Sequence, residues 1–395
     1  MTTGGPADHE YAVVIPTLGR PTLAAAVLST IAQHPRPREI VVVVDGTDPG
    51  VVPDYLMEFP ELRVLTTGGR RGPSAARMMG VATCHAPLVA FLDDDDEWLP
   101  GKMTAQLKLF IALRARSPYP VVSCRAYLAY HGRVTSQIGP TEPLCDGETL
   151  LDHMFVRRHV IPQGFKLGSS SLLVPRALLE AEPWDERLHL HEDWEWLVRV
   201  SRRDDVHLVV HPAPLISYTK SGRGHASRPG GAWRLSVEFA DRIGLGARSR
   251  GDFLLAAAGN SVTLRDRAES VRAAAWVWRN ADAGPVAWLV FLLRLTLPDP
   301  VLRAAVSLAR ATRRAARTAA SVGRPDSDRA DRLVTPNPHG SPPPGRVDGR
   351  RRGVEIFPSD ISDGPASAHV AGAPVETNRI GSVHLGPRPP AVTPR

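Results

Sequence analysis

The chain has little cysteine, and the spacing of these cysteines excludes two classes of protein. Cys84, Cys124 and Cys145 are odd in number and far apart, and no CxxC pair occurs among the 395 residues. A zinc ribbon or a disulfide framework needs cysteines that pair. We therefore expect a reducing, cytoplasmic compartment. The first ten residues agree with this, because they are polar, include Asp8 and Glu10, and do not read as a signal peptide.

Hydrophobic runs long enough to cross a membrane are missing as well. A strongly apolar stretch at residues 286–297 has 12 residues and is interrupted by Arg294. A transmembrane helix needs about 20 predominantly apolar residues. The stretch is therefore too short to span a bilayer.

The motifs of several common enzyme classes are absent. Residues 16–21 (PTLGRP) follow the first predicted strand where a GxGxxG would stand, and no GxxxxGK[ST] occurs. GxSxG and HExxH are missing too. Nucleic acid is not an expected partner, because the net charge of +7 is spread over a long chain and the arginines cluster late without interleaved aromatics.

The first half of the chain alternates short apolar runs with longer mixed segments, which is typical of βα units. The runs that predict strands are residues 11–15, 40–44, 62–66 and 88–92, and the segments that predict helices are 22–33, 73–84 and 99–116. Later, strands are predicted at 121–130, 169–174 and 206–210, a helix at 192–203, and three or four helices between 233 and 320. The sequence thus predicts an α/β fold with a mixed, mainly parallel sheet flanked by helices.

Four adjacent carboxylates, Asp93 to Asp96, directly follow the strand predicted at residues 88–92. Two unit charges ~4 Å apart repel by about 4 kcal/mol at an effective dielectric constant of about 20. A divalent cation would relieve this repulsion, and hard oxygen ligands favour Mg²⁺, Mn²⁺ or Ca²⁺ over zinc. Such an ion usually keeps sites for substrate phosphates, so the run predicts chemistry on a phosphorylated ligand. A solvated acidic loop is the structural alternative.

Polar residues also follow two other predicted strands. Pro16 and Thr17 come after the first strand, and Asp45 comes after the second. In a parallel α/β sheet the carboxyl ends of the strands border one crevice, where ligands bind. We therefore expect these residues to meet the aspartate run, although Asp45 could also serve only as a turn former in Asp-Gly-Thr.

Taken together, these segments resemble a family-2 glycosyltransferase of the GT-A fold. The matching pieces, in the family's order, are residues 14–17 (VIPT), 43–46 (VVDG), 72–80 (GPSAARMMG), 91–98 (FLDDDDEW) and 192–193 (ED). Each piece is short, but the ordered set is specific and covers roughly residues 11–220. The resemblance implies a nucleotide-diphosphate sugar as donor and Mn²⁺ or Mg²⁺ as cofactor.

On the donor side, the resemblance implies a role for each matching residue. Pro16 and Thr17 would border the nucleotide base, and Asp45 would bind the base or the ribose. Arg77 matches the arginine of the family's Ala-Arg-Asn, but Met78 replaces the asparagine. No side-chain contact is therefore implied for position 78.

The aspartate run matches the family's DxD-type motif. The resemblance makes Asp95 the metal ligand and brings Asp93 or Asp94 to the ribose or sugar. It assigns no catalytic role to Asp96.

Asp193, preceded by Glu192, matches the aspartate that is proposed in this family to deprotonate the acceptor hydroxyl. Such a base typically contributes ~10²–10⁴ in rate, and one carboxylate on the acceptor side is enough for single displacement with inversion. Acids in the first turn of a helix also stabilise its dipole. Helix capping is thus the structural alternative for both residues.

Residues 221–231, rich in Gly, Arg, Ser and Pro, predict a mobile loop. Similar enzymes often close such a loop over the diphosphate, which would bring Arg223 and His225 to the donor. An exposed basic loop is the alternative.

We predict four regions: a flexible N-terminus (1–10), a catalytic domain (11–232), a helical segment (233–320) and a disordered tail (321–395). The tail has too few large apolar residues to offset the entropy of ordering it. In the helical segment, arginines at 303, 310, 313, 314 and 317 share one helix face. A basic amphipathic helix of this kind predicts attachment to an anionic membrane surface, unless it packs on its own domain.

The sequence therefore predicts a metal-assisted, inverting glycosyltransferase acting on a glycan or lipid-linked acceptor, peripheral on the cytoplasmic face of the plasma membrane. One alternative is a nucleotidyltransferase that forms sugar nucleotides, but of its Gly-rich basic loop only Gly19 and Arg20 are present. Another is a catalytically idle GT-A-like binding module, against which the intact acids argue.

Overall fold

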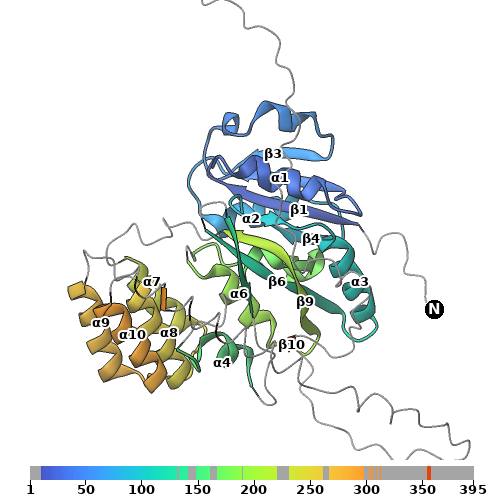
Figure 1. The fold of residues 1–395 in the computed structure, drawn as a ribbon. Helices are drawn as coiled ribbons and strands as arrows, with labels where there is room; N and C mark the ends of the chain where they lie inside the picture. Colours follow the sequence, from blue (N-terminus) through green and yellow to red (C-terminus); the bar gives the residue numbers. More distant parts are fainter. Residues whose placement is uncertain are drawn as a thin grey trace, which may run out of the picture. The chain divides into compact units, whose positions relative to one another are not determined.

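The computed structural model describes residues 10–130, 133–140, 148–160, 167–188, 190–219, 231–260 and 267–297, five positions between 301 and 312, and residues 354–356. Its first half alternates strands and helices as predicted (Figure 1). These elements are β1 (Tyr11–Thr17), α1 (Leu23–Ile31), β2 (Glu39–Val44), η2 (Pro49–Val51), η3 (Asp54–Glu58), β3 (Leu62–Thr66), α2 (Pro73–Thr83), β4 (Leu88–Phe91), β5 (Glu97–Trp98) and α3 (Lys102–Arg114).

The middle of the chain adds longer strands and the helix that carries the predicted base. The elements are β6 (Tyr119–Tyr130), β7 (Arg133–Gly139), α4 (Leu150–Phe155), η4 (Ser169–Ser171), β8 (Leu173–Pro175), α5 (Arg176–Ala181), α6 (Glu192–Val200) and β9 (Val206–Thr219). The strand predicted at 169–174 is thus half wrong, because its three serines form a 3₁₀ turn. The serine hydroxyls donate hydrogen bonds to Asp93, Asp96 and the carbonyl of Gly168.

The described strands, with β10 (Val354–Ile356), form one mixed sheet in the order β10-β9-β6-β8-β4-β1-β2-β3, and β5 pairs with β9 and β7 with β6 beside this path. Strand β1 pairs in parallel with β2 on one side and β4 on the other, and β2 pairs in parallel with β3. Strand β8 is antiparallel to β4 and β6, whereas β9 runs parallel to β6. This arrangement confirms the predicted α/β class with a mixed, mainly parallel sheet.

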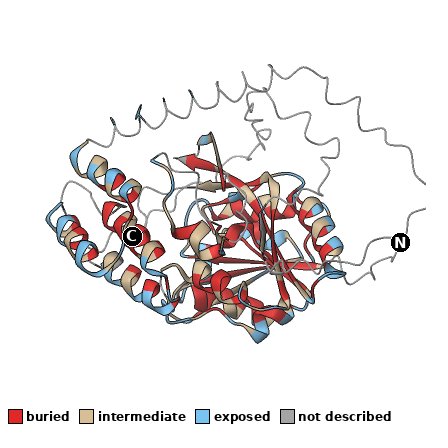
Figure 2. Cartoon of the chain, turned by 90° about the horizontal axis from the view of Figure 1, so that it is seen from below, coloured by how far each residue is buried: buried red, intermediate tan, exposed pale blue. Residues whose placement is uncertain are grey.

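Helices cover both faces of the sheet, and the side chains of β1 alternate between the two hydrophobic clusters. Val13 and Ile15 pack with α1 and α3, whereas Ala12 and Val14 pack with α2, α5 and α6. Strands buried on both faces read as continuous apolar runs, and Figure 2 accordingly shows buried strands between helices with one exposed side.

A glycine allows α2 to lie close to β1. A Cβ at Gly80 would stand 2.5 Å from Cγ1 of Val14, a separation that real side chains do not tolerate. The close approach brings α2, and with it Arg77, toward the ends of β1 and β4.

Four helices follow the sheet region: α7 (Gly231–Arg242), α8 (Ala247–Asn260), α9 (Arg267–Asn280) and α10 (Pro285–Thr296). Their buried residues, including Phe239 and Phe253, share one hydrophobic cluster with Phe155 and Trp196 of the sheet region. None of the helices in the described ranges has the length and hydropathy required to traverse a bilayer.

Two predicted regions are only partly visible. Within the tail predicted to be disordered, Val354–Ile356 form strand β10, which pairs in parallel with β9. The five arginines expected to form a basic helix face lie outside the described residues. The boundaries of the four predicted regions stay a proposal.

Candidate active site

The carboxyl ends of three adjacent parallel strands deliver the predicted donor-site residues to one edge of the sheet. Strand β1 ends at Thr17 beside Val44, the last residue of β2, and Val14 of β1 pairs with Phe91 at the end of β4. Asp45 follows β2 directly, and Asp93 lies two residues after β4. The pairing therefore brings residues from three parts of the sequence to the crevice that such sheets use for ligands.

Asp45 organises the loop between β3 and α2. Its carboxylate accepts hydrogen bonds from Thr67 Oγ1 at 3.0 Å and from the backbone N–H groups of Arg71 and Gly72 at 2.8 and 3.1 Å. Gly72 has φ of 96°, which favours glycine. Asp45 thus fixes the start of α2 and, through it, the position of Arg77.

The aspartate run alternates between buried and accessible side chains. Asp94 and Asp96 are each 1% exposed, whereas the side chains of Asp93 and Asp95 keep 30% and 18% of their accessible surface. Two of the four carboxylates are therefore structural, and the other two border the crevice.

Asp94 ties the run to the loop after β1. Thr17 Oγ1 donates to one of its oxygens at 2.5 Å, and Arg20 forms an ion pair with the other. Arg20 also approaches Asp95 at 3.9 Å. Both oxygens of Asp94 are engaged within the protein, so the predicted contact of Asp94 with ribose or sugar would require Arg20 or Thr17 to move.

The carboxylate of Asp96 accepts hydrogen bonds from a serine hydroxyl and from a backbone amide. Ser170 Oγ donates to it at 2.6 Å, and the N–H of Thr219 donates at 2.8 Å. Burial, and after it the charges of Asp93 and Asp95, raise the pKa of Asp96 well above its ordinary value. Ser170 Oγ also accepts the N–H of Asp93 at 3.0 Å, so this one hydroxyl contacts both ends of the run.

Replacing Ser170 by alanine is expected to lower the free energy of unfolding by about 1–3 kcal/mol, because a buried carboxylate and a backbone N–H each lose a partner. Urea unfolding of both variants measures this. Ser201→Ala is the matched control, since its hydroxyl only donates to Val198 O of its own helix, and a change below about 0.5 kcal/mol is expected there. Equal losses in both variants would contradict the role of Ser170.

Arg77 joins the donor side to the predicted base. Its guanidinium donates to Asp93 at 2.6 Å, to Glu192 at 2.9 Å and to Ser169 Oγ at 3.1 Å. The ring of Trp184 lies 4.9 Å from its central carbon. Burial lowers the pKa of Arg77, but Asp93 and Glu192 outweigh it and hold this pKa above its ordinary value. Arg77 therefore stays charged and bonds to Glu192, which lies 115 positions away in the chain.

Asp193 lies in the first turn of α6. The turn begins with His191 in the left-handed conformation, at φ of 62°. Burial, and then the charge of Glu192, raise the pKa of Asp193 to about 7, while Arg77 acts in the opposite direction. A carboxylate with a pKa near neutrality suits a general base.

The first turn of α6 is packed against the C-terminal helices. His191 stacks on Trp194 at a centroid distance of 4.5 Å and 12° between planes. Its ring also lies 5.0 Å from that of Phe239 in α7 and 5.3 Å from that of Phe253 in α8. This aromatic cluster positions the backbone that carries Asp193.

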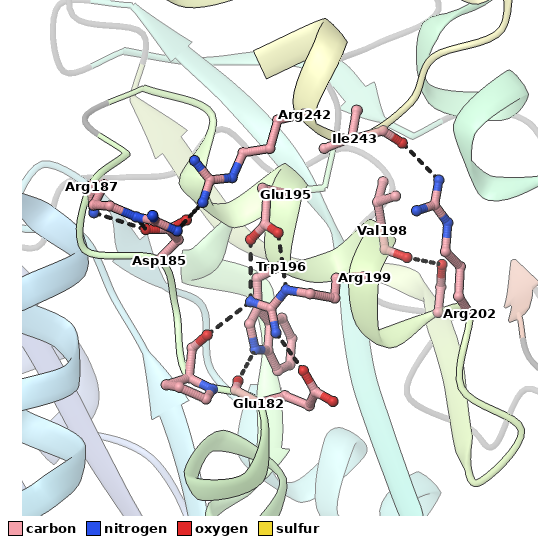
Figure 3. Close-up of polar contacts among 12 residues, drawn as sticks. Glu182, Asp185, Arg187, Glu195, Trp196, Val198, Arg199, Arg202, Arg242 and Ile243 are labelled. Carbon is pink, nitrogen blue, oxygen red and sulfur yellow. Dashed lines mark hydrogen bonds and ion pairs between the residues drawn. The ribbon is translucent and has the colours of Figure 1, made fainter. Parts of the chain in front are cut away.

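The other end of α6 is held by ion pairs and hydrogen bonds (Figure 3). Arg199 bridges Glu182 at 2.6 Å and Glu195 at 2.9 Å, and Trp196 Nε1 donates to Glu182 O at 2.7 Å. Arg202 donates to the carbonyl of Ile243 at 2.7 Å. The helix is thus fixed at both ends, which favours a defined position for Asp193.

The accessible carboxylates suit a metal ion that takes further ligands from a substrate. Burial, and then Asp93, raise the pKa of Asp95 to about 6, against the effect of Arg20. A bound cation would reduce the electrostatic repulsion between such closely spaced carboxylates. No cluster of three or more ligating side chains occurs among the described residues. Mg²⁺-type ions need only one or two carboxylates when phosphates and waters complete the shell.

Sequence reasoning assigned no role to several residues that border this site. Arg20, Ser169, Ser170 and Tyr218 contact or electrostatically influence the aspartate run, and burial followed by the charge of Asp96 raises the pKa of Tyr218. No local motif marks the serines, since only the fold brings them to the aspartates. Pro16 lies buried in β1, and the predicted loop residues Arg223 and His225 lie outside the described residues.

Several known proteins are similar to this chain. Residues 12–173 match the family described as Glycosyl transferase family 2. The succinoglycan biosynthesis protein ExoU of Rhizobium meliloti (strain 1021) is 29% identical over 223 residues, which cover 53% of this chain and 62% of that relative, less than two thirds of its length. Two solved structures of S. aureus TarS 1-349 are each 17% identical. The complex with UDP has a TM-score of 0.44 and covers 67% of this chain and 78% of that chain. The complex with UDP-GlcNAc has a TM-score of 0.46 and covers 69% and 82%.

Proposed function

We propose that the chain is a member of glycosyl transferase family 2, the family that residues 12–173 match, and that it transfers a sugar from a nucleotide-diphosphate donor to a hydroxyl of a glycan or lipid-linked acceptor. The similarity to a succinoglycan biosynthesis protein supports a glycan product. The observation that carries the proposal is the buried bridge from Asp93 through Arg77 to Glu192. It holds a donor-side carboxylate and the turn of Asp193 together.

The donor side uses the strand ends. In this proposal Pro16, Thr17 and Asp45 border the nucleotide, and Asp93 contacts its ribose or sugar. Asp95 would hold Mn²⁺ or Mg²⁺, and such an ion would neutralise charge on the leaving diphosphate. Arg20 forms an ion pair with Asp94 and lies near Asp95, so it offsets part of the negative charge of these two carboxylates.

The transfer step uses Asp193. Its carboxylate accepts the proton of the acceptor hydroxyl while that oxygen forms a bond to the anomeric carbon. The bond from the anomeric carbon to the diphosphate oxygen breaks, and the nucleotide diphosphate leaves with the electron pair. A single displacement of this kind inverts the configuration at the anomeric carbon. Arg77 keeps the turn of Asp193 beside the donor.

The metal part of the proposal is tested with Asp95→Asn. We expect a loss of transfer on the order of 10²-fold or more, because a charge that stabilises the leaving group is lost or weakened. Transfer from a panel of UDP-, GDP- and dTDP-sugars with Mn²⁺ measures it, and raising the Mn²⁺ concentration should restore part of the rate. Asp54→Asn, an exposed aspartate of η3, is the control and should behave as wild type.

Three other outcomes would contradict the metal role or the proposed function. Unchanged rates in EDTA and in the Asp95 variant would remove the metal from the proposal. Release of pyrophosphate from a nucleoside triphosphate and a sugar phosphate would indicate a nucleotidyltransferase. Donor binding without turnover on any acceptor would indicate a binding module.

We also propose that the protein works at the cytoplasmic face of the plasma membrane. A lipid-linked acceptor would lie there, and the arginines of residues 303–317 would favour an anionic surface.

A further inference from the structure

Helix α10 is apolar on its exposed side as well as on its buried side. Ala287, Val290 and Phe291 are buried, whereas Leu289 and Leu292 are 46% and 51% exposed. The other exposed residues of the helix are Pro285 and Thr296, so no charged side chain stands among them. A soluble protein normally places polar residues on the outer side of such a helix.

The apolar surface continues onto α9. Trp278 is 75% exposed and lies edge-on to Trp288 of α10 at a centroid distance of 5.6 Å. Val271, about two turns earlier on α9, is exposed as well. We call the four exposed residues Val271, Trp278, Leu289 and Leu292 the apolar face. Contiguous exposed apolar surface of this kind marks an interaction site.

The charges around the apolar face are mainly positive. Helix α9 carries exposed arginines at 267, 272 and 279 against the single acid Glu269. Helix α10 carries Arg294 and no acid, and the exposed Asp282 lies in the connection between the two helices. Arginine beside exposed tryptophan and leucine suits the boundary between anionic head groups and acyl chains, where aromatic side chains with one polar group prefer to lie.

The length of α10 decides how it would engage a bilayer. Its 12 residues measure about 18 Å at 1.5 Å per residue, which is less than the ~30 Å of a hydrocarbon core. The helix can lie along a membrane surface but cannot cross it.

We propose that the apolar face docks on an anionic membrane surface, with the leucines and Trp278 in the interfacial layer and Arg272 and Arg279 at the lipid head groups. This inference deepens the proposed function and rests on its membrane-proximal acceptor. It differs from attachment by the arginines of residues 303–317, because it uses α9 and α10.

The experiment is flotation of the full-length protein with vesicles of phosphatidylcholine alone or with 30% phosphatidylglycerol. Wild type should bind the anionic vesicles, and the triple variant Trp278→Ser/Leu289→Ser/Leu292→Ser should lose at least about 10-fold in binding. Tyr55→Ser/Met57→Ser is the matched control, because both residues are 52% exposed but lie in η3; it should bind as wild type. Arg272→Gln/Arg279→Gln should weaken binding to anionic vesicles only and reduce its dependence on salt.

Several results would overturn the inference. They are no binding by wild type, full binding by the triple variant, or a dimer of wild type that the triple variant abolishes, which would make the face a contact between two copies. Circular dichroism checks that the variants fold. Donor hydrolysis without vesicles should be equal in all of them. Vesicle binding without any donor turnover would defeat the proposed function and leave the docking surface standing.

Discussion

Replacing Asp193 by asparagine should reduce sugar transfer by ~10²–10⁴-fold, the usual contribution of a general base. The amide cannot accept the acceptor proton as a carboxylate does, yet it has nearly the same shape. Affinity for the nucleotide donor should therefore change little, since the proposed donor contacts lie within residues 16–95. Steady-state transfer and calorimetric donor binding measure the two quantities separately.

The pH dependence gives a second test of the same residue. Burial and Glu192 raise the pKa of Asp193 to about 7, and the base must be deprotonated to act. Transfer by wild type should thus rise about tenfold per pH unit below pH 7 and level off above it. The asparagine variant should lack this rise.

Glu195→Gln provides the control for Asp193. Glu195 lies on the same helix, two residues after Asp193, and pairs with Arg199 at 2.9 Å (Figure 3). Loss of this ion pair tests whether a less stable helix α6 by itself lowers activity. We expect sugar transfer near the wild-type level. If the two variants lose activity equally, or if Asp193→Asn stays active, Asp193 is not the base.

Replacing Arg77 by methionine should lower the free energy of unfolding by about 3–5 kcal/mol, because removing one partner of a buried ion pair leaves uncompensated charge. Here two carboxylates, Asp93 and Glu192, lose the same guanidinium. Since Arg77 also lowers the pKa of Asp193, the rise of residual activity with pH should move to higher pH. Denaturant unfolding and a pH–rate profile measure these effects.

Two further variants make the Arg77 prediction specific. Adding Glu192→Gln to Arg77→Met should recover part of the lost stability, because one of the orphaned charges disappears. Arg234→Met removes an arginine that is 81% exposed and pairs with Glu238 at 3.6 Å, and exposed pairs of this kind contribute about 0–1 kcal/mol. A loss at Arg77 no larger than at Arg234 would contradict the role of the bridge.

The sheet and the location of the crevice could be predicted because they depend on local patterns. The run at residues 40–44 is β-branched and apolar throughout, the run at 62–66 contains two leucines and a valine, and the strands β2 and β3 match them within one residue. Parallel pairing then brings Thr17, Asp45 and Asp93 to one edge by geometry alone.

The contacts within the crevice could not be predicted in this way. Sequence alone does not distinguish four adjacent aspartates, whereas the turn after β4 directs Asp94 and Asp96 inward and leaves Asp93 and Asp95 accessible. The bridge of Arg77 to Glu192 depends on the packing of α2 against α6. Likewise, the hydroxyls of Ser169 and Ser170 in the 3₁₀ turn bond to Asp93 and Asp96, and only the fold brings these distant residues together.

The aromatic cluster around His191 connects the start of α6 to the C-terminal helices. The proposed donor contacts lie in the first hundred residues, but His191, at the start of the turn that carries Asp193, packs on Phe239 and Phe253 of the C-terminal helices. We therefore expect substitutions in α7 and α8 to affect the proposed acceptor side more than the recognition of the nucleotide. Exchanging those helices between homologous enzymes should then alter which hydroxyl is glycosylated.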